Sequence, residues 1–381
     1  MRAPSMRPKC QAPAATLPWL LAAAIAAGGC AATPGRAGGD RDRVLREYRD
    51  AAAFMQAARF AEAKAPLDDA LLTLGGLSGG DRSAKKARGL FHEESSKGFR
   101  GEPYERVMAY YYRGIVYWMD GEPDNARACF RSAQFQDADA AEGKYQSDYA
   151  VLDYLDGYVT AKLGGDASDS LRRARSFARL GPIPDYDPKA NVLVFFEMGH
   201  GPTKFAGGEY GEQLHIRPGS SAATALNLRV AGQSARFLPA DDLSYQATTR
   251  GGRAMDFVLA NKAVFKGTTD SFGNAAIVSG AVLAGAGGGR HSVADEVGAG
   301  LLVAGLLSKI VSAATTPAAD TRAWDNLPNL IGFTTLRVPP GEQTLTADFV
   351  DAANRPVLSR NVTFTVGPGA RDTVLFLTDR R

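Results

Sequence analysis

The chain has 381 residues, of which 44 are Lys or Arg and 41 are Asp or Glu. Residues 1–29 have the character of a removable leader that holds three basic residues and no acidic one, so the rest of the chain carries 41 charges of each sign. A neutral chain gives no electrostatic reason to expect a nucleic-acid partner. The remaining length, about 350 residues, is enough for two domains of ordinary size.

The N-terminus begins with basic residues, and an uncharged apolar run follows from Leu17 to Ala27. The sequence Ala27-Gly28-Gly29-Cys30 is similar to the lipobox of a lipoprotein signal peptide, although Ala27 replaces the usual Leu. We therefore expect cleavage after residue 29 and a lipid anchor on Cys30, with plain secretion and an incidental cysteine as the alternative. Ala31, rather than Asp, follows the cysteine. By resemblance to the sorting rules of enterobacterial lipoproteins, this residue favours an anchor in the outer membrane, with the chain facing the periplasm. Residues 30–39 are small, polar and rich in Gly and Pro, as in a flexible tether.

The cysteine content excludes a disulfide framework. Cys10 leaves with the leader and Cys30 is acylated, so Cys129 is the one free thiol of the mature chain. Cys129 falls inside a predicted helix, where we expect a small buried residue rather than a nucleophile.

Residues 103–138 predict two antiparallel helices joined by Asp120-Gly121-Glu122-Pro123, because Gly ends a helix and Pro begins one. In this stretch small side chains, including Gly114, alternate with large ones, as in a tetratricopeptide repeat. A small–large–small trio recurs at the same spacing three times: Ala63, Leu67, Ala70; Ala126, Phe130, Ala133; Ala167, Leu171, Ala174. We therefore predict an irregular, tetratricopeptide-like helical domain over residues 40–182.

Nine of the 13 Tyr residues fall between Tyr104 and Tyr158, together with Trp118. Aromatic side chains on a helical array bury a large area at low entropic cost, which suits peptide recognition. The alternative is an aromatic-rich core. On the first interpretation, five residues are candidates for binding a protein partner: Tyr104, Tyr111, Tyr112, Trp118 and Tyr149.

After Gly181-Pro182 the composition changes to Gly, Pro and Thr with alternating apolar residues, so a second domain is predicted over residues 183–381. Short turns separate eight candidate strands, which suggest an antiparallel β-sandwich. The candidate strands are residues 191–197, 213–217, 225–230, 243–248, 332–338, 343–349, 362–366 and 373–377. The chain is thus expected to be an α+β multidomain protein.

An apolar, Gly/Ala-rich insertion over about residues 253–315 interrupts these strands. Each apolar run is shorter than a bilayer span, and charged residues separate the two runs. A helical hairpin packed on the sandwich or on a second copy of the chain is one interpretation. Insertion in a membrane is the other.

Three further stretches complete a known pattern. Pro103-Tyr104-Glu105-Arg106-Val107 opens the Tyr-rich helix, Phe196–Pro202 (FEMGHGP) forms a turn, and residues 319–328 (ADTRAWDNLP) precede Val338-Pro339-Pro340-Gly341. Together they resemble a poorly characterised family of bacterial lipoproteins with N-terminal tetratricopeptide-like helices and a C-terminal β domain. The resemblance covers most of the mature chain and implies no established enzyme activity. The genes of this family often lie beside genes for lipoproteins that are thought to activate penicillin-binding proteins. The resemblance therefore implies a role in envelope or peptidoglycan assembly.

Asp320, Arg322 and Trp324 within this motif are expected to have a structural role. A short Asp–Arg pair can brace a loop with charge-assisted hydrogen bonds, and the indole can close one end of the sandwich. A contact role at the surface is the alternative.

The sequence contains none of the common catalytic or metal-binding patterns. The four His residues are scattered without the spacing of a metal site. Glu197 and His200 have E-x-x-H spacing, but Gly199 and Gly201 place them on a turn. No phosphate loop and no G-x-S-x-G sequence occurs. We predict no catalytic residue, no metal and no cofactor.

These observations favour a lipid-anchored cell-envelope scaffold or adaptor that binds a protein or peptide through its helical repeats. The alternative is a structural lipoprotein that associates with membrane or with itself through the Gly/Ala-rich insertion. The third hypothesis is an enzyme with a site near Glu197 and His200.

Overall fold

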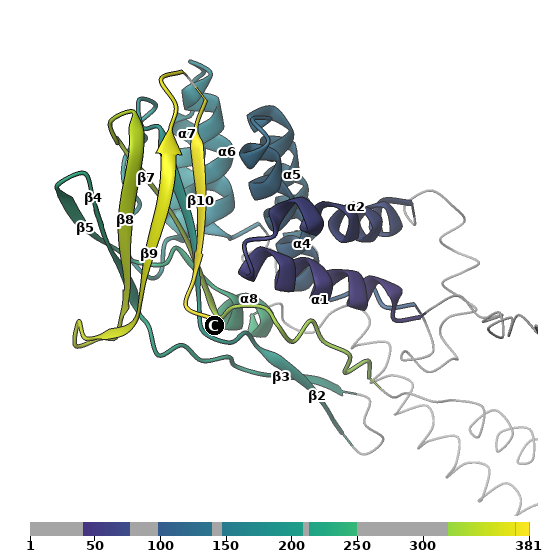
Figure 1. The fold of residues 1–381 in the computed structure, drawn as a ribbon. Helices are drawn as coiled ribbons and strands as arrows, with labels where there is room; N and C mark the ends of the chain where they lie inside the picture. The colour runs from purple at the N-terminus through teal and green to yellow at the C-terminus, as the bar shows by residue number, and fades with distance from the viewer. Residues whose placement is uncertain are drawn as a thin grey trace, which may run out of the picture. The chain divides into compact units, whose positions relative to one another are not determined.

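The computed structural model describes residues 41–76, 98–138, 147–208, 213–249, 319–369 and 371–380 (Figure 1). The leader, the tether and the Gly/Ala-rich insertion lie outside these ranges, as does Cys30. The described residues are an α+β protein in which a helical region precedes mixed and antiparallel sheets, and they belong to one compact unit that begins at Asp40. Among them, no helix is long and apolar enough to cross a membrane.

In the parts of the helical region that the structure describes, the helices form three consecutive pairs. The pairs are α1 (Arg43–Gln56) with α2 (Phe60–Gly76), α4 (Pro103–Met119) with α5 (Pro123–Asp137), and α6 (Ala150–Lys162) with α7 (Ser168–Phe177). Neighbouring pairs touch through α2 with α4 and through α5 with α6. Eight of the nine residues of the small–large–small trios are buried, and Leu171 is partly exposed. The predicted pairing of helices is therefore confirmed.

Helices α4 and α5 form because the local sequence marks each boundary. Pro103 and Pro123 occupy the first turns, and Gly121 adopts a φ of +84° in the connection between the helices. A Cβ atom added at Gly114 would lie 2.5 Å from the Phe130 ring, so only glycine permits this close approach. The predicted helical pair over residues 103–138 is confirmed.

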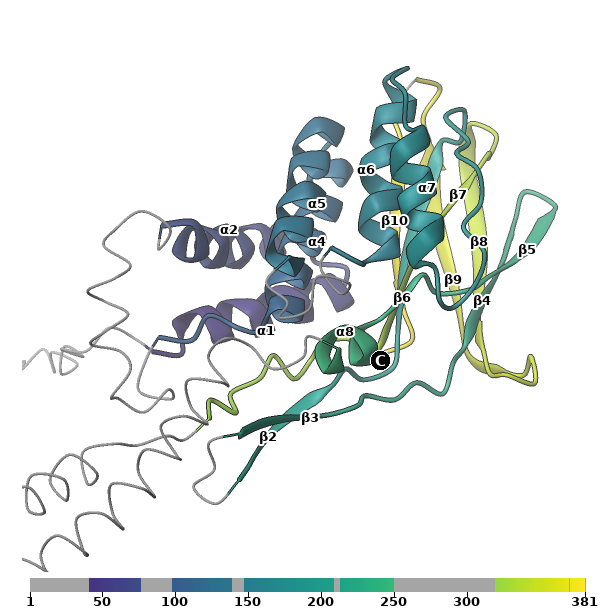
Figure 2. The ribbon, with the colours of Figure 1, turned by 180° about the vertical axis from the view of Figure 1, so that it is seen from behind.

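Two four-stranded sheets follow. The first has the order β10-β1-β7-β6 and the second the order β5-β4-β8-β9 (Figures 1 and 2). Their strands are β1 (Val192–Met198), β4 (Ala225–Val230), β5 (Gln233–Phe237), β6 (Asp241–Asp242), β7 (Leu330–Leu336), β8 (Gly341–Val350), β9 (Pro356–Val366) and β10 (Thr373–Thr378). Strands β1 and β10 run parallel, with Val192 opposite Thr373 and Glu197 opposite Thr378. The expectation of purely antiparallel pairing is wrong for this pair of strands.

A separate hairpin is formed by β2 (Thr203–Gly207) and β3 (Gln213–Arg217), and it extends away from the two larger sheets (Figure 2). Strands β2, β5 and β6 were not predicted. Residues 243–248, predicted as a strand, instead form the short helix α8 (Leu243–Thr248). The reason is local, because the Asp242 side chain accepts a hydrogen bond from the Ser244 amide and caps the helix.

The alternation of side chains along β1 divides the core into two layers. Leu193 and Phe195 belong to a cluster shared with the helices, whereas Val194 and Phe196 belong to a cluster shared with the second sheet. The first sheet therefore packs against the helices on one face and against the second sheet on the other. The predicted boundary at residue 182 separates helices from strands along the sequence, but a common core joins them.

Candidate functional site

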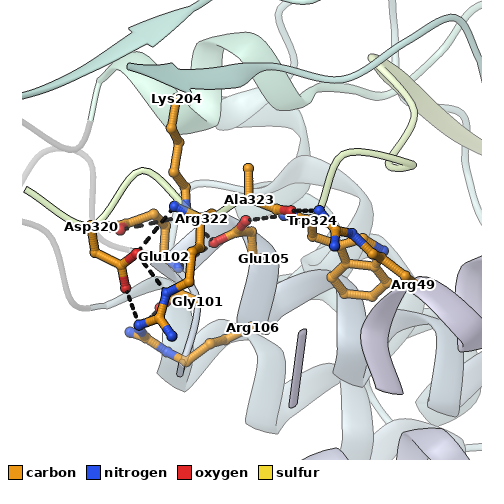
Figure 3. Close-up of polar contacts among 10 residues, drawn as sticks. All are labelled: Arg49, Gly101, Glu102, Glu105, Arg106, Lys204, Asp320, Arg322, Ala323 and Trp324. Atoms are coloured by element: carbon orange, nitrogen blue, oxygen red, sulfur yellow. Dashed lines mark hydrogen bonds and ion pairs between the residues drawn. The ribbon is translucent and has the colours of Figure 1, made fainter. Parts of the chain in front are cut away.

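The start of α4 meets the segment Ala319–Pro328 at a buried polar junction (Figure 3). Glu105 lies fully buried in the first turn of α4. Its Oε2 atom accepts hydrogen bonds from the Glu102 amide at 2.6 Å and from the Lys204 ammonium at 2.5 Å. Its Oε1 atom accepts from the Trp324 amide at 2.7 Å. One carboxylate thus joins α4, strand β2 and the ADTRAW motif.

Lys204 is the cationic partner of this junction. Its side chain is only 1% exposed, and its ammonium also donates to the Arg322 carbonyl at 2.9 Å. The Glu102 carboxylate lies 3.7 Å from the same ammonium. A buried ion pair stabilises a fold only when its remaining donors and acceptors are satisfied, and here backbone groups take that role. The hairpin β2–β3 is thereby fixed to the helical region.

Asp320 and Arg322 form a bidentate ion pair, with both Nε and Nη2 of the guanidinium donating to the carboxylate. Arg322 also donates to Asp42 at 2.7 Å and so links the motif to the beginning of α1. These hydrogen bonds, the one to Asp320 foremost, raise the pKa of the Arg322 guanidinium above its usual value. The pair therefore braces the motif, as a structural role requires.

Trp324 follows this pair and is fully buried. Its ring stacks on Tyr48 of α1, with ring centroids 4.3 Å apart and an interplanar angle of 19°. The edge of Tyr112 approaches it from α4 at 6.0 Å. Trp324 thus fills the space between two helices and the first sheet, where it is a core residue.

A groove of about 530 Å³ lies beside the motif, within the size range of ligand sites. Its walls come from α1 with its preceding residue and from the segment Thr321–Asp325. The lining residues are Asp42, Leu45, Arg46, Arg49, Thr321, Arg322, Ala323 and Asp325. Arg49 spans part of the groove by binding Asp325 through two hydrogen bonds of 2.8 and 2.9 Å. The arrangement offers guanidinium groups and peptide backbone to a ligand.

The five aromatic residues predicted to bind a partner are all buried, with at most 1% of each exposed. The Tyr111 ring lies 6.1 Å from that of Phe195 on β1, and Tyr112 donates to Glu197 at 2.7 Å. The Trp118 indole donates to Asp372 at 3.0 Å. The remaining two, Tyr104 and Tyr149, lie in the same core. The prediction of an exposed aromatic face is wrong, because the chain's own first sheet covers that side of α4.

The structure separates Glu197 from His200. Glu197 is 1% exposed beneath the helices, where loss of hydration raises the pKa of its carboxyl. His200 is exposed and pairs through its backbone with Ser220. In the described ranges, no three His, Cys, Asp or Glu residues lie together in a way that could hold a metal ion.

Sequence reasoning missed Glu105 and Lys204 as junction residues. The spacing of Glu102 and Glu105 matches that of a capping box at the start of α4, which was the available signal for Glu105. Nothing in the sequence around Lys204 distinguishes a buried lysine from an exposed one.

No protein-family model, curated protein or solved structure matches the chain. The lipoprotein family that the motif resembles therefore stays a prediction.

Proposed function

We propose that the protein is a lipid-anchored adaptor of the cell envelope, held at a membrane through Cys30 and binding a protein partner. The lipobox-like sequence and the Gly/Pro-containing tether support the anchor. Three stacked helix pairs with buried small–large–small trios support a tetratricopeptide-like region. The layer of apolar side chains shared by the two sheets supports a sandwich-like C-terminal region.

The groove between α1 and the segment Thr321–Asp325 is the observation that carries the binding role. The aromatic side of α4 is occupied by the first sheet, so it is not free for a partner. Within the described ranges nothing fills the groove, and the junction at Glu105 holds the segment that forms one of its walls. A rigid wall lowers the entropic cost of binding, because little has to be ordered when a partner arrives.

Photocross-linking in the cells that produce the protein tests this proposal. A photoreactive residue replaces Thr321, which is exposed in the groove, or Thr363, which is exposed on β9 as a matched control. We expect a covalent adduct with another polypeptide from position 321, little from position 363, and loss of the adduct in Cys30→Ser. The absence of a polypeptide adduct from both positions would contradict the adaptor role. Soluble Cys30→Ser protein that keeps the adduct would contradict the need for the anchor.

A further inference from the structure

Strand β9 (Pro356–Val366) forms an open edge of the second sheet. It pairs with β8 on one side, and no described strand pairs with its other side. Along a strand, every second residue directs its N–H and C=O groups toward such an open side. No hydrogen bond from a described residue reaches these outward backbone groups of β9. The open side is therefore a row of donors and acceptors that can pair with another extended strand.

The sequence of β9 carries few of the features that keep edge strands from pairing. Its one proline stands at the first position, and the strand contains no Lys, Asp or Glu. The one irregularity in its pairing with β8 also lies at its beginning, opposite Phe349 and Val350. Arg360, its one charged residue, is engaged within its own chain, because the guanidinium donates to the carbonyls of Thr378 and Arg380. The rest of the edge is uncharged.

The core beneath β9 is incompletely covered. On β8, the side chains of Leu345 and Phe349 point into the layer between the two sheets and are fully buried. Their partners on β9 face the same layer but remain partly exposed, as does the next apolar residue along that face. These three residues are Leu358, Val362 and Phe364. A further strand beside β9 would cover them and so remove apolar area from water.

We propose that β9 pairs antiparallel with β9 of a second copy of this chain, about a twofold axis at Asn361, and that the two second sheets thereby form one continuous sheet. The inference goes beyond the adaptor role and does not depend on it. The register follows from the length of the strand, because Asn361 is the middle one of its eleven residues. With the axis there, every residue of one strand has a partner on the other.

The side chains that meet in this register are compatible with one another. On the inner face, Phe364 lies opposite Leu358 of the second copy, and on the outer face Thr363 lies opposite Ser359 of the second copy. Apolar pairs and hydroxyl pairs of this kind stabilise neighbouring strands. Arg360 lies opposite Val362, so no two like charges are directly opposed. A surface that complements itself in this way is what a twofold interface requires.

Disulfide cross-linking tests the pairing in membranes of cells that produce the full-length chain. All variants carry Cys129→Ala, which removes a free thiol. Directly opposed residues of antiparallel strands have Cβ atoms about 4.5–5.5 Å apart, close to the separation in a disulfide. After mild oxidation we expect Asn361→Cys to give a species of twice the chain's mass. Its yield should exceed that of Thr344→Cys, an exposed control on the same face of β8, by about tenfold or more.

Two copies that carry different affinity tags test the register. Ser359→Cys in one copy and Thr363→Cys in the other should cross-link, because these residues are directly opposed. Two copies of Thr363→Cys should not, since they would lie about 13 Å apart along the strands. Adding Asn361→Lys should lower the yield from the 359 and 363 positions by about tenfold, because it opposes two like charges at the axis. Thr344→Lys is the matched control and should not lower it.

Equal yields from Asn361→Cys and Thr344→Cys would overturn the inference, as would equal yields from the two tagged combinations. A disulfide between Asn361→Cys and a different polypeptide would also overturn it, because β9 would then pair with another protein. In the photocross-linking experiment, position 363 is expected to give an adduct with a second copy alone, so it stays a control for other polypeptides. Absence of the β9 pairing would leave the adaptor role standing, and absence of a foreign adduct at position 321 would leave the β9 pairing standing.

Discussion

The carboxylate of Glu105 accepts a hydrogen bond from the backbone amide of Trp324, which lies 219 residues further along the chain. Because the same carboxylate also binds Lys204 of β2, one side chain connects the first turn of a helix, a hairpin and a loop. This contact ties the helical region to the C-terminal half at a point where both are buried.

Replacing Glu105 by Ala should lower the free energy of unfolding by about 3–5 kcal/mol, because the Lys204 ammonium would be left buried beside only the more distant Glu102 carboxylate. Chemical denaturation monitored by circular dichroism measures this change. Glu62→Ala is the control, since Glu62 forms an exposed pair with Arg59 and its loss should leave the free energy of unfolding nearly unchanged. The double variant Glu105→Leu with Lys204→Met should recover part of the loss. Equal stability of the Glu105 and Glu62 variants would contradict the role of the junction.

Trp324→Ala should destabilise the protein by about 3–5 kcal/mol, because it opens a cavity between Tyr48 and Tyr112. Trp324→Phe should cost clearly less, since a ring remains in the stack. Thermal denaturation compares both with Phe135→Ala, which removes a ring that is 77% exposed and should change stability by about 0.5 kcal/mol or less. A loss below about 1 kcal/mol for Trp324→Ala would show that the indole is not packed as described.

Gly114→Ala should destabilise the α4–α5 pair by about 1–3 kcal/mol, because the new methyl group would overlap the Phe130 ring. The matched control is Gly98→Ala, where an added Cβ would have no neighbour within 4 Å among the described residues. Urea unfolding of the two variants gives the comparison. Similar urea midpoints for the two variants would mean that α4 and α5 can move apart without loss of stability.

Asp241 predicts a dependence of stability on pH. This buried carboxyl on β6 accepts hydrogen bonds from the amides of Ala150 and Val151 at the start of α6, yet loss of hydration outweighs them and raises its pKa to about 7. The unfolded chain ionises at a lower pH, so this group contributes most to stability below about pH 4. Its contribution falls as the pH rises toward 7, by up to about 4 kcal/mol.

Asp241→Asn should flatten the change in unfolding free energy between pH 4 and pH 7, as measured by urea titrations at several pH values. Asp169→Asn, at a side chain that is 80% exposed on α7, is measured alongside as the control. Asp153, whose pKa is raised to about 6 chiefly by burial, contributes in the same direction and remains in both variants. If the unfolding free energy of Asp241→Asn changed with pH as steeply as that of the unaltered protein, another group would be responsible for the pH dependence.

The helix pairs could be predicted because their signal is local. Small–large–small spacing, with Gly121 and Pro123 between α4 and α5, determines both the helices and their close packing. Strand β1 was equally clear from its continuous apolar run. The prediction of a strand over residues 243–248 was wrong although their composition is typical of a strand. They form a helix because one side chain, Asp242, caps its N-terminus.

The aromatic residues of α4 could not be assigned from sequence. An outward-facing ring and a ring that packs on a sheet have the same helical spacing, and the residues that cover Tyr111 and Trp118 lie far along the chain at Phe195 and Phe333. The motif residues Asp320, Arg322 and Trp324 could be named in advance. Their meeting with Glu105 depends on tertiary packing, which no local pattern encodes.

The parallel pairing of β1 with β10 has a consequence for biogenesis. Strand β10, which completes the first sheet beside β1, follows α4 by more than 250 residues, so the α4 ring that packs on it, Tyr112, stays uncovered on that side while this length of chain is translated. A nascent chain that lacks this strand exposes a broad apolar surface to its surroundings. Folding during synthesis therefore depends on protection of this surface, and truncation within β10 should send the product to proteolysis.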